Sequence, residues 1–120
     1  MRRWKSAVVG LAVVVGMVGA PVVAQAGSTL CPSAKACIYV DPAYVGLLGY
    51  KSGNSALVNV SSGADNKTSS WENKTAYNGA WFEGVGGSGK CWNMGSKKEV
   101  GSIGWPNYDK LTSWRTTAGC

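Results

Sequence analysis

The sequence contains no histidine and only six acidic residues among its 120. Those six show no spacing that would join two of them as a catalytic pair; they are Asp41, Asp65, Glu72, Glu83, Glu99 and Asp109. Histidine and paired carboxylates are the commonest groups in general acid-base catalysis, and histidine is the usual base that activates a serine or cysteine nucleophile. We therefore expect that the protein is not an enzyme.

Helical periodicity is absent beyond residue 26. No segment there repeats its apolar residues at helical spacing over the roughly 10 to 12 residues that indicate a helix. Short runs of β-branched and aromatic residues at 35–40, 55–60 and 79–84 instead alternate with clusters of Gly, Ser, Asn and Pro. This pattern predicts an all-β fold.

The long apolar run lies at the start of the chain. The letters "MRRWK" precede apolar residues at 7–23 and the sequence "AQA" at 24–26. This order is typical of a secretory signal peptide, and Pro21 and several glycines argue against the alternative, a membrane anchor of about 20 apolar residues. We expect a signal peptide at 1–26, one mature domain at 27–120, a secreted extracellular protein and no stable membrane insertion after cleavage.

Signal removal also lowers the positive charge, which is +6 for the whole chain. Of the 12 basic residues, Arg2, Arg3 and Lys5 leave with the signal, so that nine remain against six acidic ones. The remaining basic residues are spread along the chain and form no basic stripe of the kind that nucleic-acid-binding proteins carry. We therefore expect no nucleic-acid partner.

All four cysteines, Cys31, Cys37, Cys91 and Cys120, lie beyond the predicted signal peptide. An even number of cysteines in a short exported chain predicts two disulfides, and four cysteines allow three pairings. We favour Cys31 with Cys37, because they are close in sequence, and Cys91 with Cys120, because that bond tethers the last residue. A zinc site is disfavoured, since the spacing fits no usual zinc finger and histidine is absent.

The mature sequence repeats itself without gaps at an offset of 43 residues. The matched pairs include Tyr39 with Phe82, Gly46 with Gly89, Leu57 with Val100, Val60 with Ile103, Lys67 with Lys110, Ser69 with Thr112, and Trp71 with Trp114. A period of this size indicates two copies of one supersecondary unit, neither of which buries its apolar face alone. We predict two Greek-key units, about 31–76 and 77–120, packed as a monomeric, disulfide-stapled sandwich with both repeated tryptophans in its core.

The first unit contains "YVDPAYVG", with Tyr39, Tyr44 and Gly46 at the spacing that resembles the Greek-key signature of βγ-crystallins. The resemblance implies a tight folded hairpin whose glycine adopts a backbone conformation that other residues resist. The second unit has Gly87 where the second aromatic belongs, which predicts a looser hairpin.

The segment "DNKTSS" at 65–70 resembles the calcium motif of the same family. The resemblance implies Asp65, Asn66 and Ser69 as Ca²⁺ ligands, with calcium an optional rather than a required cofactor. The resemblance also implies two calcium sites that share ligands from both copies of the segment. The second copy has Tyr108 where an Asn or Asp belongs, so at least one of the two sites lacks an expected ligand residue. The alternative is that Asp65, Ser69 and Ser70 satisfy backbone groups in a tight loop.

Across nearly all of the mature chain, the sequence resembles secreted microbial inhibitors of peptidase inhibitor family 36, the metalloproteinase-inhibitor type. The segments "CPSAKAC", "YVDPAYVG", "DNKTSSW" and "YDKLTSWR" carry this resemblance. It implies that a rigid loop enters the cleft of an extracellular thermolysin-like protease as a substrate would, and it gives Cys91, Trp92 and Asn93 as the inhibitory-loop candidates. The sequence departs from those inhibitors because no cysteine follows Cys91 until Cys120 to close a short ring. Core packing is the alternative role for Trp92.

Two further functions stay open. A cell-wall-binding or killer-toxin-like protein would use Trp92 and Trp105, whose Gly-rich or Pro-containing surroundings suit exposed indoles that stack on sugars. A calcium-stabilised structural protein would use the segment at 65–70.

Overall fold

The computed structural model describes residues 30–120, so the predicted signal peptide at 1–26 lies outside the described residues. The strands are β2 Lys35–Asp41, β3 Val45–Ser52, β4 Val58–Asn59, β5 Ser70–Asn73, β6 Gly79–Phe82, β7 Cys91–Met94, β8 Glu99–Val100 and β9 Ser113–Arg115. The short 3-10 helix η2 spans Val85–Gly87. The all-β prediction is confirmed. In the described part of the chain, no helix has the length and apolar character of a membrane span.

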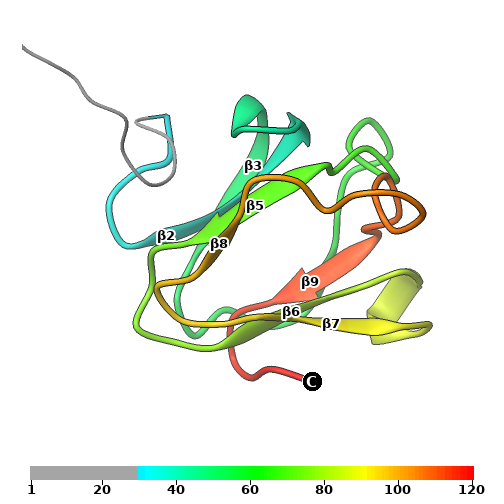
Figure 1. Ribbon diagram of the computed structural model, residues 1–120. Coiled ribbons are helices and arrows are strands. Elements are labelled where there is room, and N and C mark those ends of the chain that lie inside the picture. Colours follow the sequence, from blue (N-terminus) through cyan, green and yellow to red (C-terminus); the bar gives the residue numbers. More distant parts are fainter. Residues whose placement is uncertain (1–29) are drawn as a thin grey trace, which may run out of the picture.

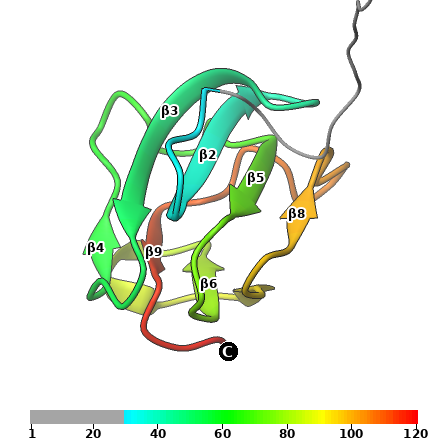
Figure 2. The same cartoon turned by 90° about the vertical axis from the view of Figure 1, so that its left-hand side faces the viewer.

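The strands form two antiparallel sheets, in the orders β3-β2-β5-β8 and β4-β9-β6-β7. Figure 1 shows them as the two layers of a sandwich, and Figure 2 shows β3, β2, β5 and β8 side by side in one layer. Each sheet takes one edge strand from the other half of the chain, because β4 pairs with β9 and β8 pairs with β5. The predicted sandwich of two Greek-key motifs is confirmed. Of the predicted run at 55–60, only Val58–Asn59 forms a strand.

The core lies between the two sheets and contains both repeated tryptophans. Trp71 is 5% exposed and Trp114 is 4% exposed, and both belong to one buried cluster, together with Ala36, Ile38, Trp81, Met94 and Leu111. Full burial of one large apolar side chain contributes about 1.5–3 kcal/mol. The prediction that the repeat places its tryptophans in a shared core is confirmed.

The folded hairpin between β2 and β3 has the predicted geometry. Gly46 has φ +78°, and a Cβ added there would lie 2.3 Å from Cγ1 of Val40. The rings of Tyr39 and Tyr44 meet edge to face, with centroids 5.7 Å apart. Glycine at this position therefore avoids both an unfavourable backbone conformation and a steric clash.

Both disulfide pairings are confirmed: Cys31 bonds Cys37, and Cys91 bonds Cys120. Because side chains alternate along a strand, Cys37 points away from the face of β2 that carries Ile38. Cys31, Cys37 and Tyr39 thus form a second small cluster apart from the main core. The N-terminal part of the described chain covers part of the outer face of the first sheet in this way.

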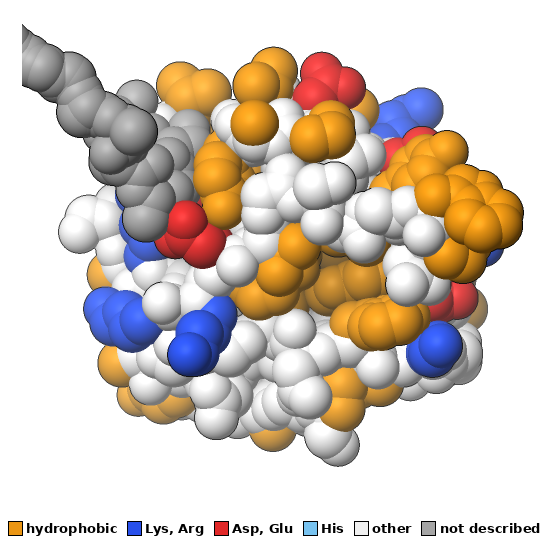
Figure 3. All heavy atoms as spheres, in the orientation of Figure 1, with side chains coloured by type: hydrophobic (Ala, Val, Ile, Leu, Met, Phe, Trp, Pro, Cys, Tyr) orange, Lys and Arg blue, Asp and Glu red, His pale blue; other side chains and the backbone are white. Residues whose placement is uncertain are grey.

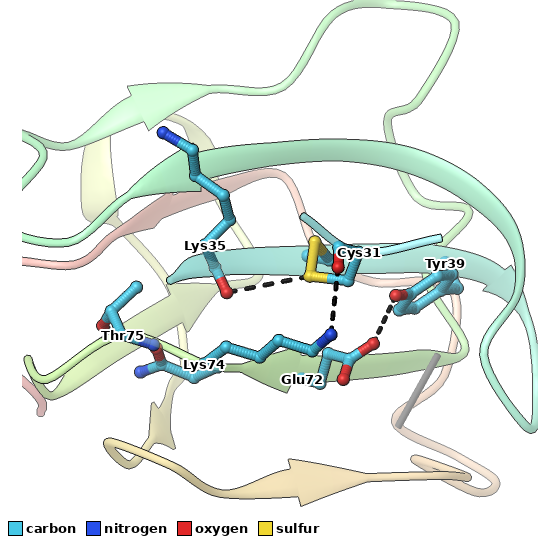
Figure 4. Close-up of a disulfide and its surroundings, with 8 residues drawn as sticks. Cys31, Lys35, Tyr39, Glu72, Lys74 and Thr75 are labelled. Carbon is cyan, nitrogen blue, oxygen red and sulfur yellow. Dashed lines mark hydrogen bonds between the residues drawn. A yellow bond between two sulfur atoms is a disulfide. The ribbon is translucent and has the colours of Figure 1, made fainter. Parts of the chain in front are cut away.

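Polar groups link β2 and the covering segment to β5 and to Lys74, the residue after it, as Figure 4 shows. The Tyr39 hydroxyl donates to the carboxylate of Glu72, which is only 2% exposed. Lys74 Nζ donates to the Cys31 carbonyl oxygen over 2.9 Å. The buried carboxylate is thereby hydrogen-bonded within the fold, as buried charges require.

Candidate functional site

The structure places the three inhibitory-loop candidates in strand β7 rather than in a loop. Strand β7 pairs with β6 and lies at the edge of its sheet. Cys91 and Trp92 are half-buried, whereas Asn93 is exposed. An edge strand is extended and leaves backbone groups on one side without a strand partner.

The Trp92 side chain is held by the fold on three sides. Its ring stacks on Trp81 with centroids 5.6 Å apart, and its indole N–H donates to Oε2 of Glu83 over 2.9 Å. Lys90 Nζ lies 4.6 Å from the ring centroid, which gives a cation–π contact. The alternative that Trp92 packs against the core is confirmed. The indole is therefore held within the fold, and Asn93 is the exposed residue among the three candidates.

The C-terminus braces β7 from the other end of the chain. The disulfide joins Cys91 to Cys120, and the Cys120 backbone N–H donates to Oδ1 of Asn93 over 2.7 Å. A Cβ on Gly119 would lie 2.5 Å from the same Asn93 oxygen, so glycine is needed for this close approach. These contacts fix β7 before any partner binds.

The turn that precedes β7 is exposed at its tip and anchored at its base. Val85 is 64% exposed. The Gly86 N–H donates to Oδ1 of Asn59 over 2.7 Å, and the Gly87 N–H donates to Oγ of Ser113 over 3.0 Å. The glycine-rich composition of the turn gave a signal for its shape, but nothing in the sequence marked Val85 as its most exposed apolar side chain.

The predicted calcium segment meets its repeat-related copy in space. Thr112 Oγ1 donates to Oδ1 of Asn66 over 3.2 Å, and Ser69 Oγ donates to Oδ1 of Asp109 over 3.3 Å. Each contact joins one copy to the other. Sequence reasoning selected Asn66 and Ser69 but missed Thr112 and Asp109, which the 43-residue repeat places at the equivalent positions.

The remaining oxygens of this segment divide into two groups. Ser70, the first residue of β5, donates through Oγ to the Asp41 carbonyl oxygen over 2.7 Å and accepts from the Tyr44 N–H, so it satisfies backbone groups of the β2–β3 hairpin rather than of its own loop. Asp65 Oδ1 and Thr68 Oγ1 are buried without a hydrogen-bond partner in the described structure. A buried oxygen without a partner costs about 1–3 kcal/mol, which a ligand could offset.

A pocket of about 670 Å³ opens beside these loops. Its lining includes Asn66, Ser69, Asp109 and Asp41. Ca²⁺ accepts carboxylate, amide and hydroxyl oxygens, so these donors fit it. Within residues 30–120 no three His, Cys, Asp or Glu side chains group as a metal site. Any calcium here would therefore depend on hydroxyl, amide and backbone oxygens as well as carboxylates.

Comparison with known proteins assigns the chain to a family. The profile of peptidase inhibitor family I36 matches residues 24–94, more than half of the chain. The chain belongs to this family. The match to family I36 includes the folded hairpin and the segment at 65–70, and it ends at Met94, the last residue of β7.

Solved structures agree on the fold. A βγ-crystallin domain from Flavobacterium johnsoniae is 16% identical with a TM-score of 0.54, over 69% of this chain and 92% of that one. A βγ-crystallin from an archaeon is 21% identical with a TM-score of 0.54, over 70% and 98%. A βγ-crystallin from Ciona intestinalis is 21% identical with a TM-score of 0.54, over 68% and 96%. None of the curated proteins matches the chain.

Proposed function

We propose that the protein is a secreted, monomeric inhibitor of an extracellular metalloprotease of the thermolysin kind. We propose further that β7 and the turn before it contact the protease. The observation that carries the proposal is the family I36 match over residues 24–94. Two disulfides are in keeping with an oxidising, extracellular compartment.

The geometry of β7 supports substrate-like binding. An extended segment can add to the edge of a partner's sheet through backbone hydrogen bonds, and β7 is an extended strand at a sheet edge. Its disulfide and its bond to the chain terminus hold it in this conformation already. A pre-ordered segment loses little conformational entropy on binding, so more of the contact energy contributes to affinity.

The same contacts oppose cleavage. If a protease cut the bond between Cys91 and Trp92, Cys91 would stay attached through Cys120 and Trp92 would stay stacked on Trp81. The two new ends would remain close together, which slows product release and favours rejoining of the bond. A rigid segment of this kind inhibits because it leaves the cleft slowly.

The test is titration of the purified mature protein against thermolysin, with two matched variants. Val85→Arg changes the exposed tip of the turn before β7, and we expect inhibition to weaken at least tenfold. Val45→Arg changes a valine that is 53% exposed in the first unit, and we expect inhibition to be unchanged. Absence of inhibition at micromolar excess would contradict the proposed target, and equal inhibition by both variants would contradict the proposed contact.

A second function is supported by the cross-copy contacts between Asn66 and Thr112 and between Ser69 and Asp109. In this proposal Ca²⁺ binds at Asn66 and Thr112 or at Ser69 and Asp109 and stabilises the fold. A ligand at 100 times its dissociation constant stabilises the folded state by about 2.7 kcal/mol. We expect millimolar Ca²⁺ to raise the melting temperature, and Asn66→Ala with Asp109→Ala to abolish the rise. An unchanged melting temperature in the unsubstituted protein would exclude this function.

A further inference from the structure

Trp105 is the most exposed large apolar side chain in the described part of the chain, at 82%. Tyr108, which is 40% exposed, lies three residues further along the same loop between β8 and β9. An indole left in water forfeits the free energy that burial of a large aromatic would provide, about 1.5–3 kcal/mol. Exposed aromatic side chains of this kind mark a binding surface when they gather beside a pocket.

The loop that carries Trp105 is ordered by its own hydrogen bonds. The N–H groups of Asn107 and Tyr108 each donate to the Gly104 carbonyl oxygen over 2.9 Å, and Gly104 has φ +80°. The Asp109 N–H donates to the Thr68 carbonyl oxygen over 2.8 Å. The exposed indole is therefore presented by a structured turn and would lose little backbone freedom when it binds a ligand.

The pocket beside the loop combines aromatic and polar walls. Trp105 and Tyr108 line it together with Asp41, Asn66 and Asp109, and its volume is about 670 Å³. Figure 3 shows a projecting group of hydrophobic side chains on the right of the molecule with acidic side chains next to it. Lys67 is the one cationic residue in the pocket lining.

The aromatic and polar residues that line the pocket restrict the class of ligand that can bind there. A flat indole suits the apolar C–H face of a sugar ring, and carboxylate and amide oxygens accept hydrogen bonds from sugar hydroxyls. A purely apolar ligand would strip water from two carboxylates without replacing their hydrogen bonds. A polyanion would meet two like charges against one Lys. A neutral saccharide is the class that satisfies both walls.

We propose that this pocket binds a neutral saccharide, with Trp105 stacked on a sugar ring and Asp41 and Asp109 accepting hydroxyl hydrogen bonds. The two indoles that the sequence singled out for sugar stacking have different surroundings. Trp92 is stacked on Trp81 and bonded to Glu83, whereas Trp105 is free to meet a ligand. The proposal does not depend on protease inhibition, because β7 lines no part of this pocket.

The test measures binding of the mature protein to a panel of neutral oligosaccharides by calorimetry, with chitohexaose, cellohexaose, maltohexaose and mannohexaose as probes and polygalacturonate as the anionic contrast. We expect at least one neutral probe to bind and Trp105→Ala to weaken that binding tenfold or more. Tyr50→Ala removes an aromatic that is 53% exposed outside the pocket, and it should leave binding unchanged. Each measurement is made with calcium and with a chelator, since three calcium candidates, Asn66, Ser69 and Asp109, also line the pocket.

Several outcomes would overturn the proposal. They are no binding of any neutral probe, binding of polygalacturonate alone, or equal binding by the protein and its Trp105→Ala variant. Loss of protease inhibition in Trp105→Ala without any saccharide binding would make Trp105 a protein contact instead. Because Trp105 is exposed, the melting temperature of Trp105→Ala should match that of the unsubstituted protein. Val85→Arg should leave saccharide binding intact, so the two proposals can fail separately.

Discussion

The two Greek-key units place different pairs of interacting side chains at equivalent positions. Tyr39 in the first unit and Phe82 in the second are equivalent in the repeat, as are Glu72 and Arg115. In the first unit the Tyr39 hydroxyl donates to Glu72. In the second the Arg115 guanidinium lies 5.3 Å from the centroid of Phe82. A ring that lacks a hydroxyl cannot donate to a carboxylate, and a cation over its face is the arrangement that suits it.

The outer faces of the two sheets are likewise covered from opposite ends of the chain. The segment with Cys31 and Cys37 covers the first sheet. In the second unit, Arg115 donates to the carbonyl oxygens of Ala118 and Gly119, and Cys91 bonds Cys120. The first unit is therefore closed by a short-range disulfide beside an aromatic cluster, whereas the second is closed by a long-range disulfide to Cys120.

Among the changes considered, removal of a disulfide should give the largest difference in stability loss between the two units. From the entropy of loop closure, we expect loss of the Cys91–Cys120 bond to lower the free energy of unfolding by about 4 kcal/mol. Loss of the Cys31–Cys37 bond should lower it by about 2 kcal/mol, because the Cys31–Cys37 bond closes a shorter loop. Urea denaturation of Cys91→Ala with Cys120→Ala and of Cys31→Ala with Cys37→Ala measures both effects. If the first-unit variant were the less stable, packing of its buried cysteines would outweigh loop length.

Glycine substitutions should distinguish the two hairpins by a smaller amount. Gly46→Ala introduces a Cβ 2.3 Å from Val40 and forces φ +78° on alanine, so we expect a loss of about 2–3 kcal/mol. Gly86 in the second hairpin has φ +60° with no atom within 4 Å of an added Cβ. Gly86→Ala should therefore cost only the conformational term, about 1 kcal/mol. Equal costs in thermal unfolding would show that the clash at Val40 relaxes freely.

The aromatic and charged pairs should respond differently to small changes. Tyr39→Phe removes the hydroxyl that donates to buried Glu72, and we expect a loss of about 1–2 kcal/mol. Phe82→Tyr adds the corresponding hydroxyl in the second unit. There the counterpart of Glu72 is Arg115, whose guanidinium cannot accept a hydrogen bond from that hydroxyl. The substitution should not stabilise the fold, and a gain in unfolding free energy would mean that the two units are interchangeable at this position.

Much of the fold could be predicted from the repeat, because Gly46, Trp71 and Trp114 report directly on a hairpin and a core that each copy must share. Both disulfides also followed from sequence position. The exchange of β4 and β8 between the sheets could not, since two-residue strands such as Val58–Asn59 carry no periodic signal. Their pairing depends on tertiary contacts, which override local preference.

The candidate site was predictable only in part, for the same reason. Asn66 and Ser69 lie in a recognisable segment, but their hydrogen-bond partners come from the second copy. Trp92 and Trp105 are both predicted from the sequence as indoles that could stack on sugars. Trp92 is packed because β7 pairs with β6 in a register that places Trp92 opposite Trp81. That register cannot be predicted from the residues next to Trp92 in the sequence.

The smallest predicted effect concerns Lys51, whose equivalent in the second unit is the fully buried Met94. Lys51 Nζ donates to the Trp114 carbonyl oxygen over 2.8 Å and lies 4.8 Å from the Trp114 ring centroid. Burial lowers the pKa of Lys51 from 10.5 to about 8. The folded state therefore holds fewer protons than the unfolded state between about pH 8 and 10.5, and its stability from this residue rises with pH across that window.

Lys51→Met installs the residue of the second unit and should remove this rise. Because Lys51 is only partly buried and solvent screens its charge, we expect a difference of about 1 kcal/mol or less between pH 7 and pH 10. Urea denaturation of both proteins at pH 7, 8.5 and 10 measures the slope, and taking the difference between them cancels the tyrosines that titrate in the same range. If the variant kept the slope of the unsubstituted protein, another group would titrate there. If it lost the slope without losing stability at pH 10, the first unit would tolerate the apolar contact on which the second already depends.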